Sequence, residues 1–155
     1  MLIIKMMKRT HLAFALAFAL LFLPHVNNKI IFIPLVLFFS FIPDVDSPTS
    51  YLGNYKIFRP LQGISGHRGA FHSLTFCIFF SLIFAFFLPI LALSFFLGYS
   101  SHIFADSFTI EGVMPFWPSK KVSAGFIRTG GKRESFIFWI LIVVNVILFA
   151  RLFIK

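Results

Sequence analysis

Residues 71–107 read FHSLTFCIFFSLIFAFFLPILALSFFLGYSSHIFADS, and this stretch decides the fold. It contains two apolar runs, Phe71–Leu88 and Ile90–Ser107, which are separated by Pro89 alone. A helix rises about 1.5 Å per residue, so each run approaches the ~30 Å thickness of the hydrocarbon core of a bilayer. Strands are excluded, because an open sheet edge cannot lie in hydrocarbon, whereas a helix satisfies its own backbone groups. The stretch therefore predicts two transmembrane helices that form a hairpin at Pro89.

Three further apolar runs lie outside this hairpin, namely Leu12–Pro24, Ile30–Pro43 and Phe136–Ile154. The first two would be only about 20 Å long as helices, and they predict a tilted or partly inserted hairpin. The whole chain is 59% hydrophobic and 12% charged, whereas soluble domains are about 45–50% apolar and about 25% charged. We therefore expect residues 1–155 to form a single integral membrane domain. Its predicted fold is an all-α polytopic helix bundle with about five transmembrane helices, arranged as two hairpins and a C-terminal helix over residues 136–154.

The distribution of basic residues predicts the orientation of this bundle. If the N-terminus is cytoplasmic, only Lys29, Arg151 and Lys155 lie on the opposite side, and the other eleven of the 14 Lys and Arg residues are cytoplasmic. Cytoplasmic loops of membrane proteins carry such an excess, so we expect Asp44–Ala70 and Phe108–Ser135 on the cytoplasmic side of the inner membrane. The net charge of +9 lies in loops beside apolar runs, where it suits anionic lipid headgroups. The lipid bilayer is therefore the expected partner, and nucleic acid is not.

The acidic and histidine residues fall together at one end of the predicted bundle. Each hairpin begins and ends on the same membrane face, so helix ends that are far apart in the sequence meet there. Ionisable groups at a membrane are costly, and each therefore needs a partner or a function. Among the five histidines, only His25 is expected at the opposite face. The side chains expected together at the cytoplasmic face are His11, Asp44, Asp46, His67, His72, His102 and Asp106.

These residue types predict a divalent-metal site, with zinc as the expected ion. His102 and Asp106 are four residues apart and share one helical face, so one helix supplies both an imidazole and a carboxylate. Imidazoles suit zinc, and carboxylates such as those of Asp44 and Asp46 bind hard and borderline cations. Seven candidate ligands exceed the three that typically hold a catalytic zinc, so we expect one or two ions. Asp46, if it is not a ligand, is the candidate general base, and Arg68 is the candidate group for an anionic substrate oxygen.

Other interpretations of these residues remain open from the residues alone. Asp44 and Asp46 are also typical turn formers before Ser47, and His102 with Asp106 could be a hydrogen-bonded pair that joins helices. A metal or proton transporter would use the same residue types, but it predicts ionisable groups through the depth of the membrane rather than at one face. A non-catalytic bundle stapled by a metal ion predicts a closed site. The number of subunits is not indicated.

Four ordered motifs carry a resemblance to a known family. They are Thr10-His11, then Pro43-Asp44-Val45-Asp46-Ser47, then HRGAFHS from His67 to Ser73, and GYSSHIFADSFT from Gly98 to Thr109 with Gly112 and Trp117-Pro118 behind it. This series, which covers residues 10–118, resembles that of the YdjM-like family of predicted membrane-bound metal-dependent hydrolases.

The YdjM-like family is in turn distantly similar to zinc-dependent phospholipases C and P1-type nucleases, which share a His-x-x-x-Asp helix pattern. The resemblance implies zinc and phosphodiester chemistry. It predicts a membrane-bound hydrolase that acts at the cytoplasmic face on a phosphodiester or phospholipid-like substrate.

Overall fold

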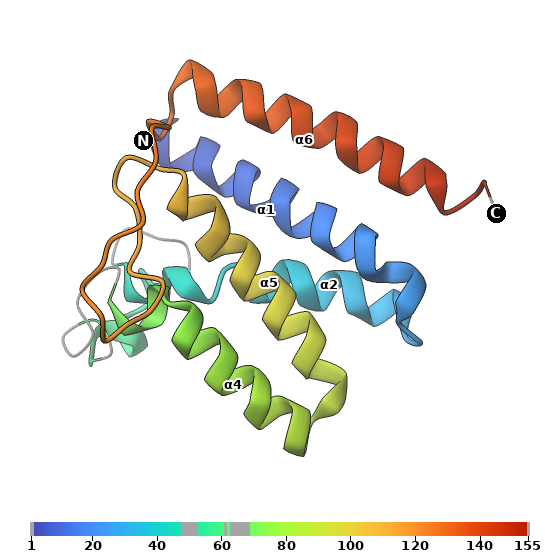
Figure 1. The fold of residues 1–155 in the computed structure, drawn as a ribbon, viewed down its shortest axis with the longest axis horizontal. Helices are drawn as coiled ribbons and strands as arrows, with labels where there is room; N and C mark the ends of the chain where they lie inside the picture. Colours follow the sequence, from blue (N-terminus) through green and yellow to red (C-terminus); the bar gives the residue numbers. More distant parts are fainter. Residues whose placement is uncertain (1, 48–52, 61, 63–68, 155) are drawn as a thin grey trace.

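The computed structural model describes residues 2–47, 53–60, 62 and 69–154, and this part of the chain is helical (Figure 1). Its only extended pairings are two isolated bridges, Thr109 with Ile127 and Val113 with Ser123. The all-α class is therefore confirmed for the described residues. The long helices are α1 (Leu2–Phe22), α2 (Lys29–Phe39), α4 (Leu74–Phe87), α5 (Pro89–Ser107) and α6 (Lys132–Arg151). The short 3-10 helices are η1 (Leu23–His25), η2 (Pro43–Asp46), η3 (Lys56–Phe58) and η4 (Ala70–His72).

The long helices form two hairpins and one additional helix, as the apolar runs predict. Helix α5 lies at the centre and contacts α1, α2 and α4, while α6 lies along α1 (Figure 1). The starts of α1, α4 and α6 and the ends of α2 and α5 all lie at one end of the molecule, on the left in Figure 1. The two hairpin turns lie toward the other end. Residues far apart in the sequence are thereby brought together at the end that carries the long connections.

Among the described residues, α6 alone is long and apolar enough to cross a membrane by length and composition. Helix α4 is apolar but shorter, and α2 has 11 residues, which gives a length of about 16 Å. Helix α1 has 21 residues because it begins at Leu2 and includes basic residues that precede the apolar run. The all-helical arrangement is confirmed, and the number of five transmembrane helices stays a prediction.

Helix α2 ends earlier than the apolar run that predicts it. The run continues to Pro43, but the α-helix ends at Phe39 and the chain then forms the 3-10 helix η2. Pro43 has no backbone N–H to donate to the Phe39 carbonyl oxygen, and that oxygen accepts from the Ile42 N–H at 3.2 Å instead, which explains why the α-helix ends at Phe39. Helix α4 begins where Ser73 caps it, since the Ser73 hydroxyl accepts a hydrogen bond of 3.1 Å from the Phe76 N–H. These two ends position the acidic residues of η2 opposite the histidine of η4.

Helices α2 and α5 meet closely at Gly98. A Cβ atom added there would lie 2.3 Å from the carbonyl oxygen of Val36 and 2.9 Å from Cβ of Phe39. Glycine lets two helix backbones approach to this extent, as at many helix interfaces in membranes. This contact holds the end of α2, with Ser40, against the last two turns of α5.

Helix α6 is attached to α1 by polar contacts within an apolar interface. The Asn145 side-chain amide donates to the Ala13 carbonyl oxygen at 3.0 Å, and the Thr10 hydroxyl donates to Oε1 of Glu134 at 2.9 Å. Glu134 is buried, and its Oε2 accepts from the Gly130 N–H at 2.5 Å. The opposite side of α6 exposes a row of large apolar side chains, which include Trp139, Val146 and Phe149. A contiguous exposed apolar face of this kind suits contact with a membrane.

Candidate metal centre

Helix α5 contributes an imidazole and a carboxylate from its last two turns. His102 and Asp106 are both buried, and Nε2 of His102 lies 3.5 Å from Oδ2 of Asp106. The two side chains are neighbours because residues four apart lie on the same helical face. The structure thus shows His102 and Asp106 on one face of α5, as their spacing predicts.

The end of α2 fixes the ring of His102. Nδ1 of His102 lies 2.7 Å from the carbonyl oxygen of Ser40. A carbonyl oxygen can only accept, so Nδ1 carries the hydrogen and Nε2 of the neutral ring carries the lone pair. Nε2 faces Oδ1 of Asp44 at 3.7 Å as well as the Asp106 carboxylate. His102 therefore presents its basic nitrogen to two carboxylates.

His72 is held in a similar way by Asp46. Nδ1 of His72 lies 2.9 Å from Oδ2 of Asp46, and both residues are 1% exposed. The carboxylate accepts the Nδ1 hydrogen and leaves Nε2 of His72 turned toward Oδ2 of Asp106, at 3.7 Å. The Tyr99 hydroxyl also donates to the Phe71 carbonyl oxygen, and this bond ties η4 to α5. His72 is thus positioned from two sides.

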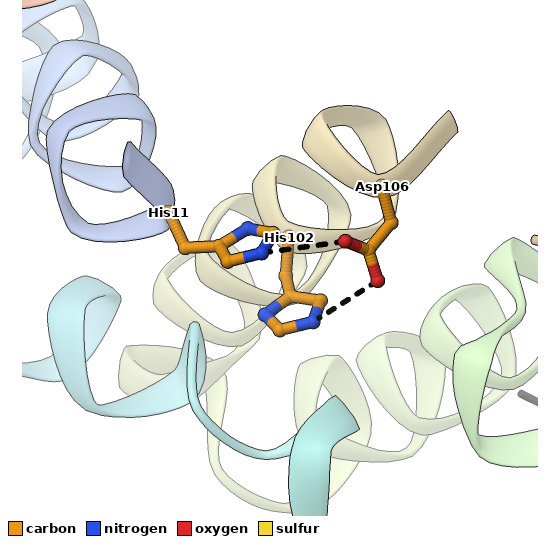
Figure 2. Close-up of side chains that lie close together, drawn as sticks. All are labelled: His11, His102 and Asp106. Carbon is orange, nitrogen blue, oxygen red and sulfur yellow. Dashed lines mark ion pairs between the residues drawn. The ribbon is translucent and has the colours of Figure 1, made fainter. Parts of the chain in front are cut away.

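His11 completes the cluster from α1. Its Nε2 lies 3.3 Å from Oδ1 of Asp106, and its ring stacks on that of His102 with centroids 4.1 Å apart and planes 6° apart (Figure 2). The two oxygens of Asp106 consequently face different imidazoles: Oδ1 faces His11, and Oδ2 faces His72 and His102.

Three buried polar atoms of the cluster have no hydrogen-bond partner among the described residues. They are Nδ1 of His11, Nε2 of His102 and Oδ1 of Asp106. A buried polar atom without a protein partner loses its hydration without compensation, so it points to a bound water or ion as its partner.

The side chains form two sets of possible metal ligands, and within each set the donor atoms all lie within 4.8 Å of one another. One set comes from His11, His102 and Asp106, and the other from Asp44, His72 and His102. Nitrogen and carboxylate oxygen donors at this spacing fit zinc or a similar divalent cation.

The structure brings together most of the side chains that the sequence predicts. His11, Asp44, His72, His102 and Asp106 belong to the two donor sets. Asp46 belongs to neither set and lies against Nδ1 of His72, on the side of the ring away from Asp106. His67 and Arg68 lie outside the described residues. His25 is exposed in η1, at the turn between α1 and α2 and away from the cluster.

Two functional contacts were missed by sequence reasoning. The Ser40 carbonyl oxygen holds His102, but any residue has a carbonyl, so no side-chain pattern marks it. The contact of Glu134 with Thr10 joins residues that are 124 positions apart, so no local pattern marks it. The burial of the Glu134 carboxylate, which indicates a partner, is visible only in the structure.

The chain resembles known membrane proteins along nearly all of its length. The sequence model of the family described as "YdjM inner membrane protein" matches residues 6–155. The chain is 37% identical over 99 residues to the Inner membrane protein YdjM of Escherichia coli (strain K12), an alignment that covers 57% of this chain and 50% of that protein. The protein of the same name from Shigella flexneri matches with the same identity and coverage. The chain thus spans about half the length of the curated relatives it matches. No solved structure matches.

Proposed function

The chain belongs to the YdjM inner membrane protein family, and from its buried cluster we propose that it is a metal-dependent hydrolase of the inner membrane. The observation that carries this proposal is the environment of Nε2 of His102. This nitrogen belongs to both donor sets, it is buried, and among the described residues it has no hydrogen-bond partner. Its lone pair faces the carboxylates of Asp44 and Asp106 at 3.7 and 3.5 Å, and such an arrangement is favourable when a cation lies among these atoms.

The proposed ligands are His11, Asp44, His72, His102 and Asp106, which hold one or two ions, with zinc preferred for their imidazoles. Asp106 would contribute a carboxylate whose two oxygens face different imidazoles. His102 offers one lone pair, so it serves one ion at a time. When bound, a divalent cation supplies Lewis-acid chemistry for hydrolysis.

The neighbouring groups orient the histidines, and the exposure of the carboxylates indicates the side from which the cluster is open. Ser40 and Asp46 hold His102 and His72 in fixed orientations, as outer partners of metal-bound histidines do. The Asp44 side chain is 25% exposed, whereas that of Asp106 is 4% exposed. Asp44 therefore marks the open side of the cluster, where water and substrate approach. Asp46, which the sequence offers as the general base, is too enclosed to meet water and acts as a positioning residue.

We place this site at the cytoplasmic face of a multi-pass protein. Support comes from the end of the molecule at which the cluster lies, because the N-terminus of α1 and the described parts of the long connections are there too (Figure 1). The described parts of those segments, together with the first turn of α6, carry ten of the 14 basic residues, and cytoplasmic segments carry such an excess. A phosphodiester or phospholipid-like substrate fits both the predicted zinc chemistry and the location. Arg68 stays the candidate group for its anionic oxygen.

The proposal predicts zinc-dependent hydrolysis. Protein purified into nanodiscs should hydrolyse bis-p-nitrophenyl phosphate or phosphatidylglycerol, lose this activity on chelation and regain it with zinc, since the cluster supplies its ligands only to a bound cation. The measurements are product release and zinc content in the same samples. Zinc flux into proteoliposomes without hydrolysis of either substrate would overturn the hydrolase assignment in favour of a transporter. Bound zinc with neither activity would leave a metal-stapled bundle.

Replacing Asp46 with alanine should weaken zinc binding without removing a ligand. Loss of an outer partner of a metal-bound histidine costs about 10–100-fold in metal affinity, so we expect a loss in this range. Asp46→Asn keeps an acceptor oxygen for Nδ1 of His72 and should lose less. Zinc titration against a competing chelator measures both variants. Glu111→Gln, which changes an exposed acid outside the cluster, is the control. Wild-type affinity in Asp46→Ala would contradict the positioning role.

A further inference from the structure

A cavity of about 390 Å³ lies between α1, α5 and α6 and shares His11 with the metal centre. Its volume is in the range of small-molecule sites, which are about 300–1,000 Å³. Aromatic and aliphatic side chains form most of its wall. The residues that line it include Thr10, His11, Phe14, Phe104, Phe108 and Ile137.

The polar groups in this wall are already engaged. The Thr10 hydroxyl donates to Glu134, and the other oxygen of Glu134 accepts from Gly130. The Thr109 hydroxyl donates to the Asp106 carbonyl oxygen at 2.7 Å and accepts from the Gly112 N–H at 3.2 Å. The cavity therefore presents hydrocarbon to its occupant, except where His11 connects it to the metal centre.

The opening of the cavity combines exposed aromatic rings with positive charge. Phe104 is 46% exposed and Phe126 is 68% exposed. A neighbouring hollow shares Phe126 and Ile137 with the cavity and adds Lys132 and Arg133 to the lining. The Arg133 guanidinium lies 5.7 Å from the centroid of the Phe126 ring. Both basic residues open α6, where the helix dipole also attracts anions.

We propose that this cavity holds a hydrocarbon chain of an anionic phospholipid, with its phosphate between the α6 cations and the His11 side of the metal centre. The apolar wall selects the chain, and the charge at the opening selects the headgroup. This inference rests on the proposed function, because it names the substrate of that same site. It also gives a reason for a cavity that extends from the candidate metal centre toward the exposed apolar side chains Phe104 and Phe126.

The test uses phosphatidylglycerol with a diazirine at the middle of one chain, incorporated into phosphatidylcholine nanodiscs that contain the protein. After illumination, peptide mass spectrometry should find adducts concentrated on the cavity segments of α1, α5 and α6. Ile137→Trp fills the cavity and should reduce labelling there roughly tenfold, which corresponds to about 1.4 kcal/mol of binding free energy. Val146→Trp places the same side chain on the exposed face of α6 and serves as the matched control. The same diazirine on phosphatidylcholine should label the cavity less, because it lacks the net negative charge.

The outcomes separate this inference from the hydrolase proposal. Zinc content equal to that of the wild type in Ile137→Trp shows that the variant is folded, so its loss of labelling reports the cavity. Equal cavity labelling of Ile137→Trp and Val146→Trp, or adducts spread evenly over all exposed helix faces, would overturn the lipid-chain site. Preserved cavity labelling in a protein that neither binds zinc nor hydrolyses phosphodiesters would leave the lipid-chain site standing and refute the hydrolase.

Discussion

Replacing His102 with alanine should abolish high-affinity zinc binding. The zinc affinity should fall by more than the roughly 100-fold that is the largest typical effect of removing an outer partner of a metal ligand. His102 is the one residue common to both donor sets, so its removal reduces each of them to two side chains. Its position at the centre of the cluster also means that no other histidine can take over its role. The loss should appear both as zinc stoichiometry after dialysis and as affinity against a competing chelator.

A thermal readout distinguishes loss of metal from loss of fold in this variant. A ligand that binds only the folded state raises the unfolding temperature, so zinc should stabilise the wild type but not His102→Ala. His25→Ala removes an exposed imidazole at the far end of the molecule and should respond to zinc as the wild type does. Zinc stabilisation that persists unchanged in His102→Ala would refute the assignment of the cluster as a metal centre.

Replacing Gly98 with alanine should destabilise the protein, although the same change stabilises an exposed helix by about 1 kcal/mol. The new Cβ would meet the Val36 carbonyl oxygen at 2.3 Å and the Ser40 backbone nitrogen at 3.0 Å. These are backbone atoms, which cannot rotate away as a flexible side chain can. Overpacking of a core typically costs about 1–3 kcal/mol, so we expect a loss of this size in the free energy of unfolding.

The same substitution should also weaken the metal centre, because separation of α2 from α5 moves the Ser40 carbonyl oxygen away from Nδ1 of His102. Unfolding in mixed micelles measures the stability, and zinc titration measures the effect on the site. Ser100→Ala, two residues along the same helix, adds no atom and is the control. A Gly98→Ala protein as stable as the wild type would show that the two helices do not meet as closely as described.

The hairpins were predictable because hydrocarbon imposes a simple pattern on a sequence. Long apolar runs must be helical in lipid, and Pro89 between two such runs marks a turn. Because successive runs alternate in direction, the order of the runs predicts which helix ends lie at the same end of the bundle. The residues at these ends are His11, Asp44, His72, His102 and Asp106. The start of α1 was not predictable in this way, because helix formation at Leu2 does not require the apolar residues by which runs are recognised.

The roles of the individual carboxylates could not be predicted, because they depend on rotation rather than on spacing. Asp44 and Asp46 are two residues apart, and the 3-10 turn of η2 directs one toward His102 and the other behind His72. A regular α-helix through Pro43 would have directed them differently. Likewise, the cavity beside His11 depends on how α6 packs against α1, and no local pattern in either helix encodes that packing.

The bond between Thr10 and Glu134 has a consequence for the order of biogenesis. Thr10 directly precedes the histidine that α1 contributes, and its partner belongs to α6, which the ribosome makes after the other four long helices. A nascent chain that extends as far as the end of α5 thus already contains every proposed ligand, while the segment bearing His11 still lacks the Glu134 carboxylate that contacts Thr10. The segment that bears His11 therefore gains the support of Glu134 only after α6 has been made and has packed against α1.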